Sequence, residues 1–312
     1  MENIVVIGSG HMGVGIAAIF IAAGHDVVVL GRQLPAVEAR LPAMRALAAT
    51  LPSAKAPGQL TAASVSEWNQ WDGVTLVIET IPEQLAAKQA LFAELDHRVP
   101  AHIPIGTNSS GYGIDQIAAG LQTTDRMLNV HYSMPAHIVP MVEVALGAHT
   151  RLPLAEAVCR LIEATGKKTT LIKKYIPGLL ISRLQHALMR EALSLVDQGI
   201  VTPQAIDDAV RFGFGFRYAA IGPMAQKEMS GWDTHVVSGA AVYPSLSNIS
   251  TPPACVTDLV KQGRTGMNQG AGFERWTPAE VAEFKRKYEL RLRAAFEVLG
   301  VAPDEAAGDQ RP

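Results

Sequence analysis

The sequence predicts an α/β fold: a doubly wound parallel sheet with helices on both faces, followed by an all-helical C-terminal domain. Short apolar runs rich in β-branched residues alternate with helical stretches in the first half of the chain, a pattern typical of a covered parallel sheet. A glycine-rich turn follows the first run. The strand pattern stops after about residue 173, close to Pro177 and Gly178. We therefore expect a first domain over residues 1–174 and a second over residues 175–312.

The expected elements follow from local patterns. Apolar residues recur at helical spacing in the helical stretches, whereas the strands are short apolar runs. A hydroxyl before a proline at Thr202 and a capping box from Thr277 to Glu280 mark helix starts. Strands are expected at residues 4–7, 26–30, 74–78, 103–106 and 127–130, and helices at residues 14–23, 84–95, 179–198 and from 277 to about 299.

Composition excludes several functional classes. The chain has 312 residues, 48% hydrophobic and 18% charged, with a formal net charge of -2. Such a balance gives no electrostatic footprint for nucleic acid or for an anionic membrane. The two cysteines, Cys159 and Cys255, have no metal-ligand spacing, so we expect neither a metal site nor a disulfide. The N-terminal residues lack a basic start and a long apolar run, which predicts no secretory signal and a cytoplasmic location.

The glycine-rich turn reads Gly8-Ser-Gly10-His11-Met12-Gly13 and lies between the first expected strand and the first expected helix. In that context the first glycine permits a tight turn, the second lets a pyrophosphate approach the backbone, and the third lets helix and strand pack closely. The free amides of the helix N-terminus then bind the phosphates. The turn predicts a Rossmann-type dinucleotide site; the alternative is a purely structural glycine turn.

The end of the second strand departs from the usual NAD pattern. NAD enzymes tend to place an acidic residue there to bind the ribose 2′-hydroxyl, but this chain has Gly31 followed by Arg32. An arginine offers a planar cationic partner for the 2′-phosphate of NADP. Arg32 therefore favours NADP, while a surface arginine that stacks on the adenine would leave NAD in use.

A histidine and a glutamate form the third candidate constellation. His131 ends an apolar strand, where open α/β sheets bind ligands, and Glu143 follows after a proline-containing stretch that would let the chain double back. Alcohol oxidation needs a base for the hydroxyl proton, and a histidine oriented by a buried carboxylate suits that role. The alternative is an ordinary loop histidine.

Several motifs in order make the chain similar to the L-3-hydroxyacyl-CoA dehydrogenase superfamily, closest in pattern to its lambda-crystallin/L-gulonate 3-dehydrogenase branch. The resemblance runs from about residue 4 to residue 299. It implies NAD or NADP as cofactor and a 6-phosphogluconate dehydrogenase-like helical second domain that forms a homodimer. The motifs are residues 8–13, Val77-Ile-Glu-Thr-Ile-Pro-Glu83, Thr107-Asn-Ser-Ser110, the stretch 131–143, Gly178-Leu-Leu-Ile-Ser-Arg183, residues 211–218, Ile221-Gly-Pro223, Gly263-Arg-Thr-Gly266 and Gly270-Ala-Gly-Phe273.

The resemblance also implies roles for individual residues. His131 matches the general base of the family, and Glu143 matches its carboxylate partner. Ser110 matches a serine that bonds the substrate oxygen, Asn108 lies in the same loop near the nicotinamide, and Glu79 follows a strand on the cofactor side.

Two positions depart from the pattern of the family. Ser182 replaces an asparagine in the motif that ends at Arg183, and Met134 replaces an asparagine after the catalytic histidine. Ser182 keeps a hydroxyl that can donate a hydrogen bond but has a shorter reach. Arg217 or Arg183 could bind a substrate carboxylate through a bidentate contact; Arg217 is the slightly preferred candidate, and a helix-cap or salt-bridge role is an equal alternative for either.

Three functions follow as hypotheses. The first is oxidation or reduction of a small, free 3-hydroxy acid. The second is a 3-hydroxyacyl-CoA dehydrogenase, whose family members carry a lysine-bearing arm between the second and third clear strands to hold CoA. Here residues 47–74 contain a single basic residue, Lys55, which favours the small acid. The third is a non-catalytic, crystallin-like protein, against which the retention of His131, Glu143 and Ser110 argues.

Overall fold

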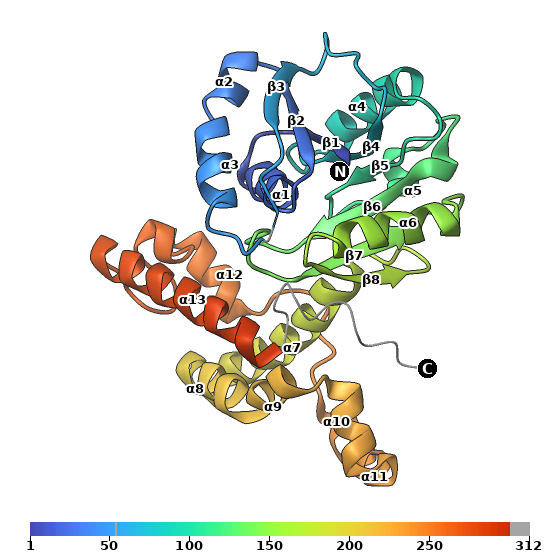
Figure 1. Ribbon diagram of the computed structural model, residues 1–312. Coiled ribbons are helices and arrows are strands. Elements are labelled where there is room, and N and C mark those ends of the chain that lie inside the picture. Colours follow the sequence, from blue (N-terminus) through green and yellow to red (C-terminus); the bar gives the residue numbers. More distant parts are fainter. Residues whose placement is uncertain (54, 300–312) are drawn as a thin grey trace. The chain divides into compact units, whose positions relative to one another are not determined.

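The computed structural model describes residues 1–53 and 55–299. The described residues form two compact units, one over Met1–Arg183 and one over Leu184–Leu299 (Figure 1). The division falls inside helix α7 (Leu179–Asp197), later than the expected boundary after residue 174. The first turn of that helix therefore belongs with the sheet.

The first unit is built on an eight-stranded sheet in the order β3-β2-β1-β4-β5-β6-β7-β8. The strand order reverses between β1 and β4, the place where doubly wound sheets bind ligands. Neighbouring strands are parallel except β6 and β7, which form an antiparallel pair. The strands are β1 (Asn3–Ile7), β2 (Asp26–Gly31), β3 (Leu60–Ser64), β4 (Val74–Glu79), β5 (Ile105–Thr107), β6 (Met127–Tyr132), β7 (Met141–Leu146) and β8 (Lys168–Ile172).

All five expected strands are present, and three further strands complete the sheet. β3 has the weak sequence Leu-Thr-Ala-Ala-Ser and lies at the sheet edge. β7 carries a glutamate in its centre, and β8 begins with lysine and two threonines. These polar or small residues hide the apolar pattern, so only their pairing with neighbouring strands identifies them as strands.

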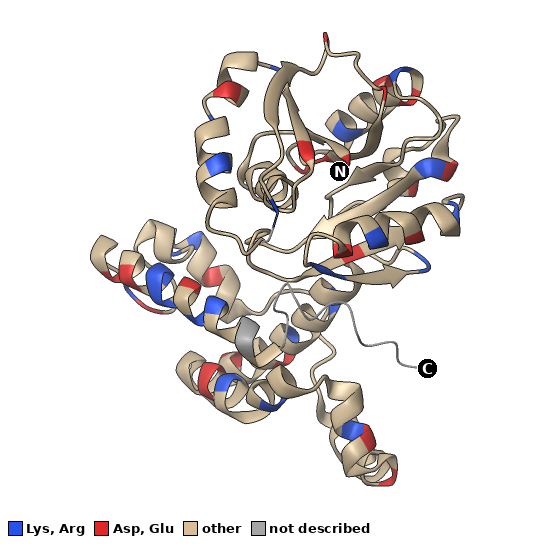
Figure 2. Ribbon diagram, viewed as in Figure 1, with Lys and Arg blue, Asp and Glu red and all other residues tan. Residues whose placement is uncertain are grey.

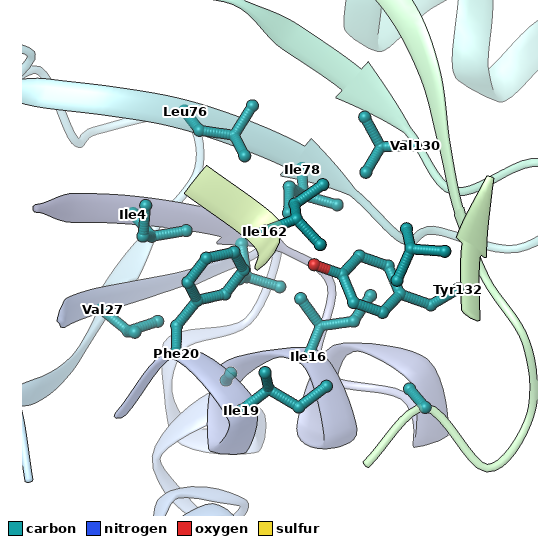
Figure 3. Packing of buried hydrophobic residues seen from close by; sticks show 14 of the residues in the cluster. Ile4, Ile16, Ile19, Phe20, Val27, Leu76, Ile78, Val130, Tyr132 and Ile162 are labelled. Carbon is teal, nitrogen blue, oxygen red and sulfur yellow. The ribbon is translucent and has the colours of Figure 1, made fainter. Parts of the chain in front are cut away.

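Helices cover both faces of this sheet and create two apolar cores (Figure 1). Residues of α1, α3 and α6 pack on one face, and residues of α4 and α5 pack on the other. Figure 3 shows Phe20 and Ile16 of α1 meeting strand residues of the first core. The helices are α1 (His11–Ala22), α2 (Leu34–Glu38), α3 (Leu41–Ala48), α4 (Leu85–Arg98), α5 (Ile114–Ile117) and α6 (Leu152–Glu163), with a 3-10 turn, η1 (Thr124–Arg126).

The second unit is helical, as expected, apart from isolated β-bridges near Ala271. The Thr202 hydroxyl accepts a hydrogen bond from the Ala205 amide, and Thr277 and Glu280 bond reciprocally; both predicted helix starts are confirmed. Beyond α7 the elements are α8 (Pro203–Asp208), a π-helical stretch η2 (Ala209–Phe214), α9 (Gly215–Ala220), α10 (Pro223–Ser230), α11 (Trp232–Val242), η3 (Tyr243–Ser245), α12 (Ala254–Lys261), η4 (Met267–Gln269) and α13 (Pro278–Leu299).

Charged residues of both signs are interspersed over each unit (Figure 2), in keeping with the small net charge of the chain. Among the described residues, no helix combines the length and the apolar character that crossing a bilayer requires.

Candidate active site

The glycine-rich turn connects β1 to α1. A side chain would have a different steric effect at each of its three glycines. Gly8 has a φ of 111°, and a Cβ there would lie 2.6 Å from the Thr80 hydroxyl oxygen. A Cβ on Gly13 would lie 1.9 Å from the Gly8 carbonyl oxygen. At Gly10, by contrast, a Cβ would meet nothing within 4 Å. The first and third glycines are therefore required by packing, whereas the second leaves open space above the backbone.

That open space faces a helix end suited to an anion. Gly10 is the N-cap of α1, and no side chain caps the first turn, so the first amides of the helix are available to a ligand. His11 is exposed, whereas the partly buried Met12 side chain packs against the core. An open glycine next to uncapped amides fits the pyrophosphate of a dinucleotide.

The end of β2 has no room for the acidic residue of typical NAD enzymes. A Cβ on Gly31 would lie 2.4 Å from Cγ2 of Val37, and Val37 is a buried residue of α2. Arg32 follows as an exposed residue. This chain therefore lacks the acidic residue at the end of β2, and the Val37 side chain of α2 fills the space beside Gly31.

The antiparallel β6–β7 pair brings His131 and Glu143 together. The two residues are direct partners in the strand register, and the distance from His131 Nδ1 to Glu143 Oε2 is 2.9 Å. The Glu143 side chain is fully buried, and the His131 side chain keeps 13% exposure. Since Nδ1 faces the carboxylate, Nε2 is the nitrogen left for a substrate.

The other oxygen of Glu143 binds the start of α7. Oε1 accepts hydrogen bonds from the amides of Leu180 at 2.7 Å and Ile181 at 2.8 Å. Burial alone would raise the pKa of the Glu143 carboxyl, but the hydrogen bonds from His131 and the two amides outweigh it and lower the pKa. Glu143 is thus held as a carboxylate that orients the imidazole.

Positive φ angles aim those amides at the carboxylate. Gly178 has a φ of 80° and the following Leu179 a φ of 50°, although Leu179 carries a fully buried side chain. A non-glycine residue in the left-handed region costs roughly 1–3 kcal/mol and is found where the surroundings enforce it. Ser182 lies in the same helical turn, half-buried, one residue after the Ile181 amide that binds Glu143.

Ser110 lies on a turn that leaves β5 at the same sheet edge. It is half-buried. Asn108, which precedes it in this turn, accepts a hydrogen bond from the Tyr132 amide at 2.9 Å through Oδ1, so its side chain joins the β5 turn to the end of β6. Because β5 and β6 are parallel, Ser110, which follows β5, and His131, near the end of β6, both lie at this edge.

The surroundings of Glu79, expected on the cofactor side, give it a structural role. It ends β4 as predicted, but its carboxylate is fully buried and is satisfied by Lys88 Nζ at 2.7 Å, by the Thr107 hydroxyl at 2.6 Å and by the Ile81 amide at 2.6 Å. A carboxylate enclosed in this way supports the loops of the site.

Sequence reasoning missed the residues that hold these loops. Lys88 is buried between Glu79 and Glu83, with Glu83 Oε2 at 3.4 Å. One signal could have found it: Lys88 shares the apolar face of its helix with Phe92 and Leu95, where a charge needs a buried partner. The role of Asn129 in β6 was equally hidden, because its partners belong to a distant loop.

Arg217, the sequence-based candidate for a substrate carboxylate, lies on α9 of the second unit and is exposed. The other expected site residues belong to the first unit. Most of the expected cofactor residues surround β1, β2 and α1, whereas Glu79 ends β4 and Asn108 follows β5. His131 lies near the end of β6, Glu143 lies opposite it on β7, and Ser110 follows β5.

A doubly wound sheet with this glycine-rich turn and a His–Glu pair at its carboxyl edge defines the class of dinucleotide-dependent dehydrogenases. Family models agree: 3-hydroxyacyl-CoA dehydrogenase, NAD binding domain, matches residues 3–175, and the C-terminal domain of the same enzymes matches residues 178–276. The chain belongs to the 3-hydroxyacyl-CoA dehydrogenase family. It is an NAD-dependent dehydrogenase that acts on a CH–OH group.

Individual relatives match most of the chain. The 5-formyl-3-hydroxy-2-methylpyridine 4-carboxylate 5-dehydrogenase of Mesorhizobium japonicum is 30% identical over 96% of this chain and 98% of its own length. An L-carnitine dehydrogenase of Streptomyces griseus is 32% identical over 74% of this chain and 70% of its own length. The lambda-crystallin/L-gulonate branch is not distinguished by these matches.

A solved structure of a 5-formyl-3-hydroxy-2-methylpyridine 4-carboxylic acid 5-dehydrogenase, described as an NAD⁺ dependent dismutase, superposes with a TM-score of 0.86. It is 28% identical, and the match covers 96% of this chain and 99% of that one.

Proposed function

We propose that the protein interconverts a secondary alcohol and a ketone on a small 3-hydroxy acid, with His131 and Glu143 as the general-base pair. The observation that carries this proposal is the 2.9 Å contact between His131 Nδ1 and Glu143 Oε2. Glu143 is buried and anchored by two backbone amides, so it holds the imidazole in one orientation. Such an arrangement leaves Nε2 as a proton acceptor at the edge of the sheet where ligands bind.

In the oxidation, His131 Nε2 takes the proton of the substrate hydroxyl while the C–H bond breaks and the carbonyl forms. The bound nicotinamide supplies the acceptor for the hydride. Glu143 stabilises the imidazolium that results and remains ionised itself. Ser110 donates a hydrogen bond to the substrate oxygen, and Ser182, in the first turn of α7, is a further candidate residue of this site.

A free acid is the proposed substrate class. The chain between α3 and β4 contains a single basic residue, Lys55, which is little positive charge for the phosphates of CoA. Relatives named for carnitine and for a pyridine carboxylate act on small acids. Arg217 stays the sequence-based candidate for the carboxylate contact, on the strength of its bidentate chemistry.

A second candidate is oxidation of an aldehyde on a small aromatic acid. The match of nearly full length to the pyridine carboxylate dehydrogenase, with a TM-score of 0.86, favours it. A hydrated aldehyde is itself a CH–OH compound, so His131 could take its hydroxyl proton in the same way. Loss of hydride and proton from the hydrate yields the acid, and a second aldehyde molecule reduced to the alcohol would complete a dismutation.

A substrate panel separates these candidates. Free 3-hydroxy acids, 3-hydroxybutyryl-CoA and 5-formyl-3-hydroxy-2-methylpyridine 4-carboxylate are each assayed with NAD and with NADP. We expect the highest kcat/KM for a free 3-hydroxy acid, whereas a higher value for 5-formyl-3-hydroxy-2-methylpyridine 4-carboxylate would favour the second candidate. A kcat/KM for 3-hydroxybutyryl-CoA far above that of every free acid would overturn the proposed substrate class.

The proposed base is tested with the best substrate from that panel. His131→Asn should lower kcat by roughly 10²–10⁴-fold, the usual contribution of general acid–base catalysis, with little change in cofactor affinity. His102→Asn is the matched control, because His102 is an exposed histidine before β5, at the opposite edge of the sheet. Wild-type turnover in His131→Asn would refute the assignment.

Other properties belong to the same proposal. Arg32 and the missing acid at Gly31 support acceptance of NADP beside NAD. The exposed apolar surface of α7 supports a homodimer. A cytoplasmic location is the expectation from the N-terminal sequence.

A further inference from the structure

Asn129 lies on β6 two residues before His131, so both side chains leave the same face of the strand. Tyr132 leaves the opposite face and enters the apolar core beside Ile16 (Figure 3). Asn129 is fully buried. Its position is that of an amide in a strand whose neighbours Leu128 and Val130 are buried apolar residues.

All the polar groups of the Asn129 amide bind one segment. Nδ2 donates to the carbonyl oxygens of Ser109 at 3.1 Å and Tyr112 at 2.9 Å. Oδ1 accepts a hydrogen bond from the Ile114 amide at 2.8 Å. The segment from Ser109 to Ile114 is the turn that carries Ser110. The strand that contains His131 is therefore hydrogen-bonded directly to this turn.

Glu83 holds the same turn from another side. Its Oε1 accepts hydrogen bonds from the Ser109 hydroxyl at 2.5 Å and from the Gly111 amide at 2.9 Å. These are the two residues that flank Ser110. The two residues that flank Ser110 are therefore held in place. The conformation of this turn sets the direction of the Ser110 side chain.

The cost of burying an unpaired polar group explains why an asparagine at position 129 holds the Ser110 turn. A buried amide without partners is strongly unfavourable, and the fully buried Asn129 finds all its partners outside its own strand. These partners all lie in the Ser110 turn, and an apolar residue in place of Asn129 would leave two carbonyl oxygens and one amide of the turn without their hydrogen bonds. The Asn129 side chain therefore links β6 to the turn that carries Ser110.

We propose that Asn129 is a positioning residue that fixes Ser110 relative to His131, so that the substrate oxygen is held where the imidazole removes its proton. This inference rests on the proposed roles of Ser110 and His131. It adds a residue that touches neither substrate nor cofactor and acts only through the turn.

Asn129→Asp is the sharpest test, because it keeps the shape and the acceptor but turns the donor Nδ2 into an oxygen that faces two carbonyls. Asn129→Ser is the second variant, since its hydroxyl is uncharged and too short to bridge the turn. Both should lower kcat/KM to about the level of Ser110→Ala, roughly 10²-fold for a lost donor to the reacting oxygen. The KM for the dinucleotide should stay unchanged.

A double-mutant cycle separates positioning from general destabilisation. If Asn129 acts through Ser110, then Ser110→Ala combined with Asn129→Asp should lose no more activity than Ser110→Ala alone. Thr150→Val is the matched control: Thr150 also makes two hydrogen bonds from its side chain, with Gly147 and Met127, but at the far end of the β6–β7 pair. It should lower stability with wild-type kcat/KM.

The outcomes are distinguishable. Full additivity in the cycle, or wild-type kcat/KM in both Asn129 variants while Ser110→Ala is impaired, would overturn the positioning role alone. Wild-type kcat/KM in Ser110→Ala would overturn the proposed role of Ser110 and the inference with it. Hydrogen exchange at Gly111 and Tyr112 gives an independent readout: faster exchange in Asn129→Ser is expected, and unchanged exchange would show that Asn129 does not hold the turn.

Discussion

Lys167 is a buried cation that serves the segment between His131 and Glu143. Its Nζ donates to the carbonyl oxygens of Ala136 at 2.7 Å and Val139 at 2.9 Å, both in the connection from β6 to β7. Burial lowers the pKa of Lys167 from 10.5 to about 8, while the two carbonyls favour the protonated form that can donate to both. The contact therefore closes the chain reversal that brings the histidine and the glutamate together.

The lowered pKa of Lys167 predicts a pH-dependent stability. Between about pH 8 and 10.5 the unfolded chain keeps a proton that the folded protein has lost, so this side chain makes the free energy of unfolding rise with pH by up to about 1.4 kcal/mol per unit. Below pH 8 Lys167 is protonated in both the folded and the unfolded state, so it no longer makes the free energy of unfolding depend on pH. Lys167→Met should remove the rise, which urea unfolding between pH 7 and 9.5 measures.

The neighbouring lysine supplies the control. Lys168 is exposed, so Lys168→Met should keep the wild-type dependence of unfolding free energy on pH. Identical slopes in wild type and Lys167→Met would contradict the assigned pKa.

At the scale of elements, cofactor preference is set by how α2 packs on the end of β2. The buried side chain of Val37 occupies the space that a Cβ on Gly31 would need. A single substitution to an acid at this position therefore conflicts with the packing of the helix. The chain cannot regain the acidic residue of NAD enzymes without also changing α2.

This packing predicts the behaviour of a cofactor-switching pair. Gly31→Asp alone should be destabilised by about 1–3 kcal/mol, the usual cost of overpacking. Gly31→Asp with Val37→Ala should recover part of that loss and weaken NADPH binding about tenfold, because the carboxylate repels the 2′-phosphate. Fluorescence titration with NADH and NADPH measures the dissociation constants.

Val37→Ala alone is the reference for the pair and should leave the ratio of NADH to NADPH affinity unchanged. If the wild-type protein already binds NADH far more tightly than NADPH, Arg32 is not a phosphate contact.

At the scale of the whole molecule, exposed apolar side chains are concentrated in the second unit. Among the described residues, all but four of the exposed large apolar side chains belong to the second unit, which starts at Leu184. The exceptions are Met1, Met134, Leu152 and Leu180. Helix α7 contributes Leu184 at 62% exposure and Met189 at 42%. Apolar surface of this extent usually marks an interface.

We predict a homodimer in which α7 contributes to the interface. Light scattering at micromolar concentration should give twice the mass of the chain, and Leu184→Glu should shift the population toward monomer by burying a charge at the contact. Leu152→Glu is the control, since Leu152 is an exposed leucine of the first unit and should leave the mass unchanged. A monomeric mass for the wild-type protein would contradict the prediction.

The sequence by itself determined the class of fold, the cofactor-binding turn and the candidate chemistry. The glycines, the apolar strand runs and the helix caps are local signals, because each depends on residues within a few positions of one another. The family followed from the order of such motifs. His131 and Glu143 could be proposed as partners since a short chain reversal separates them.

Only the tertiary structure decided what depends on residues far apart in the chain. The β6–β7 register put Glu143 opposite His131, and the α7 amides that bind its second oxygen come from residues 180 and 181. The burial of Glu79 and its contacts with Lys88 and Thr107 show a role in supporting the loops of the site. The partners of Asn129 belong to a separate loop. A side-chain hydrogen bond across strands leaves no periodic trace in sequence, so these roles appear only when the chain is folded.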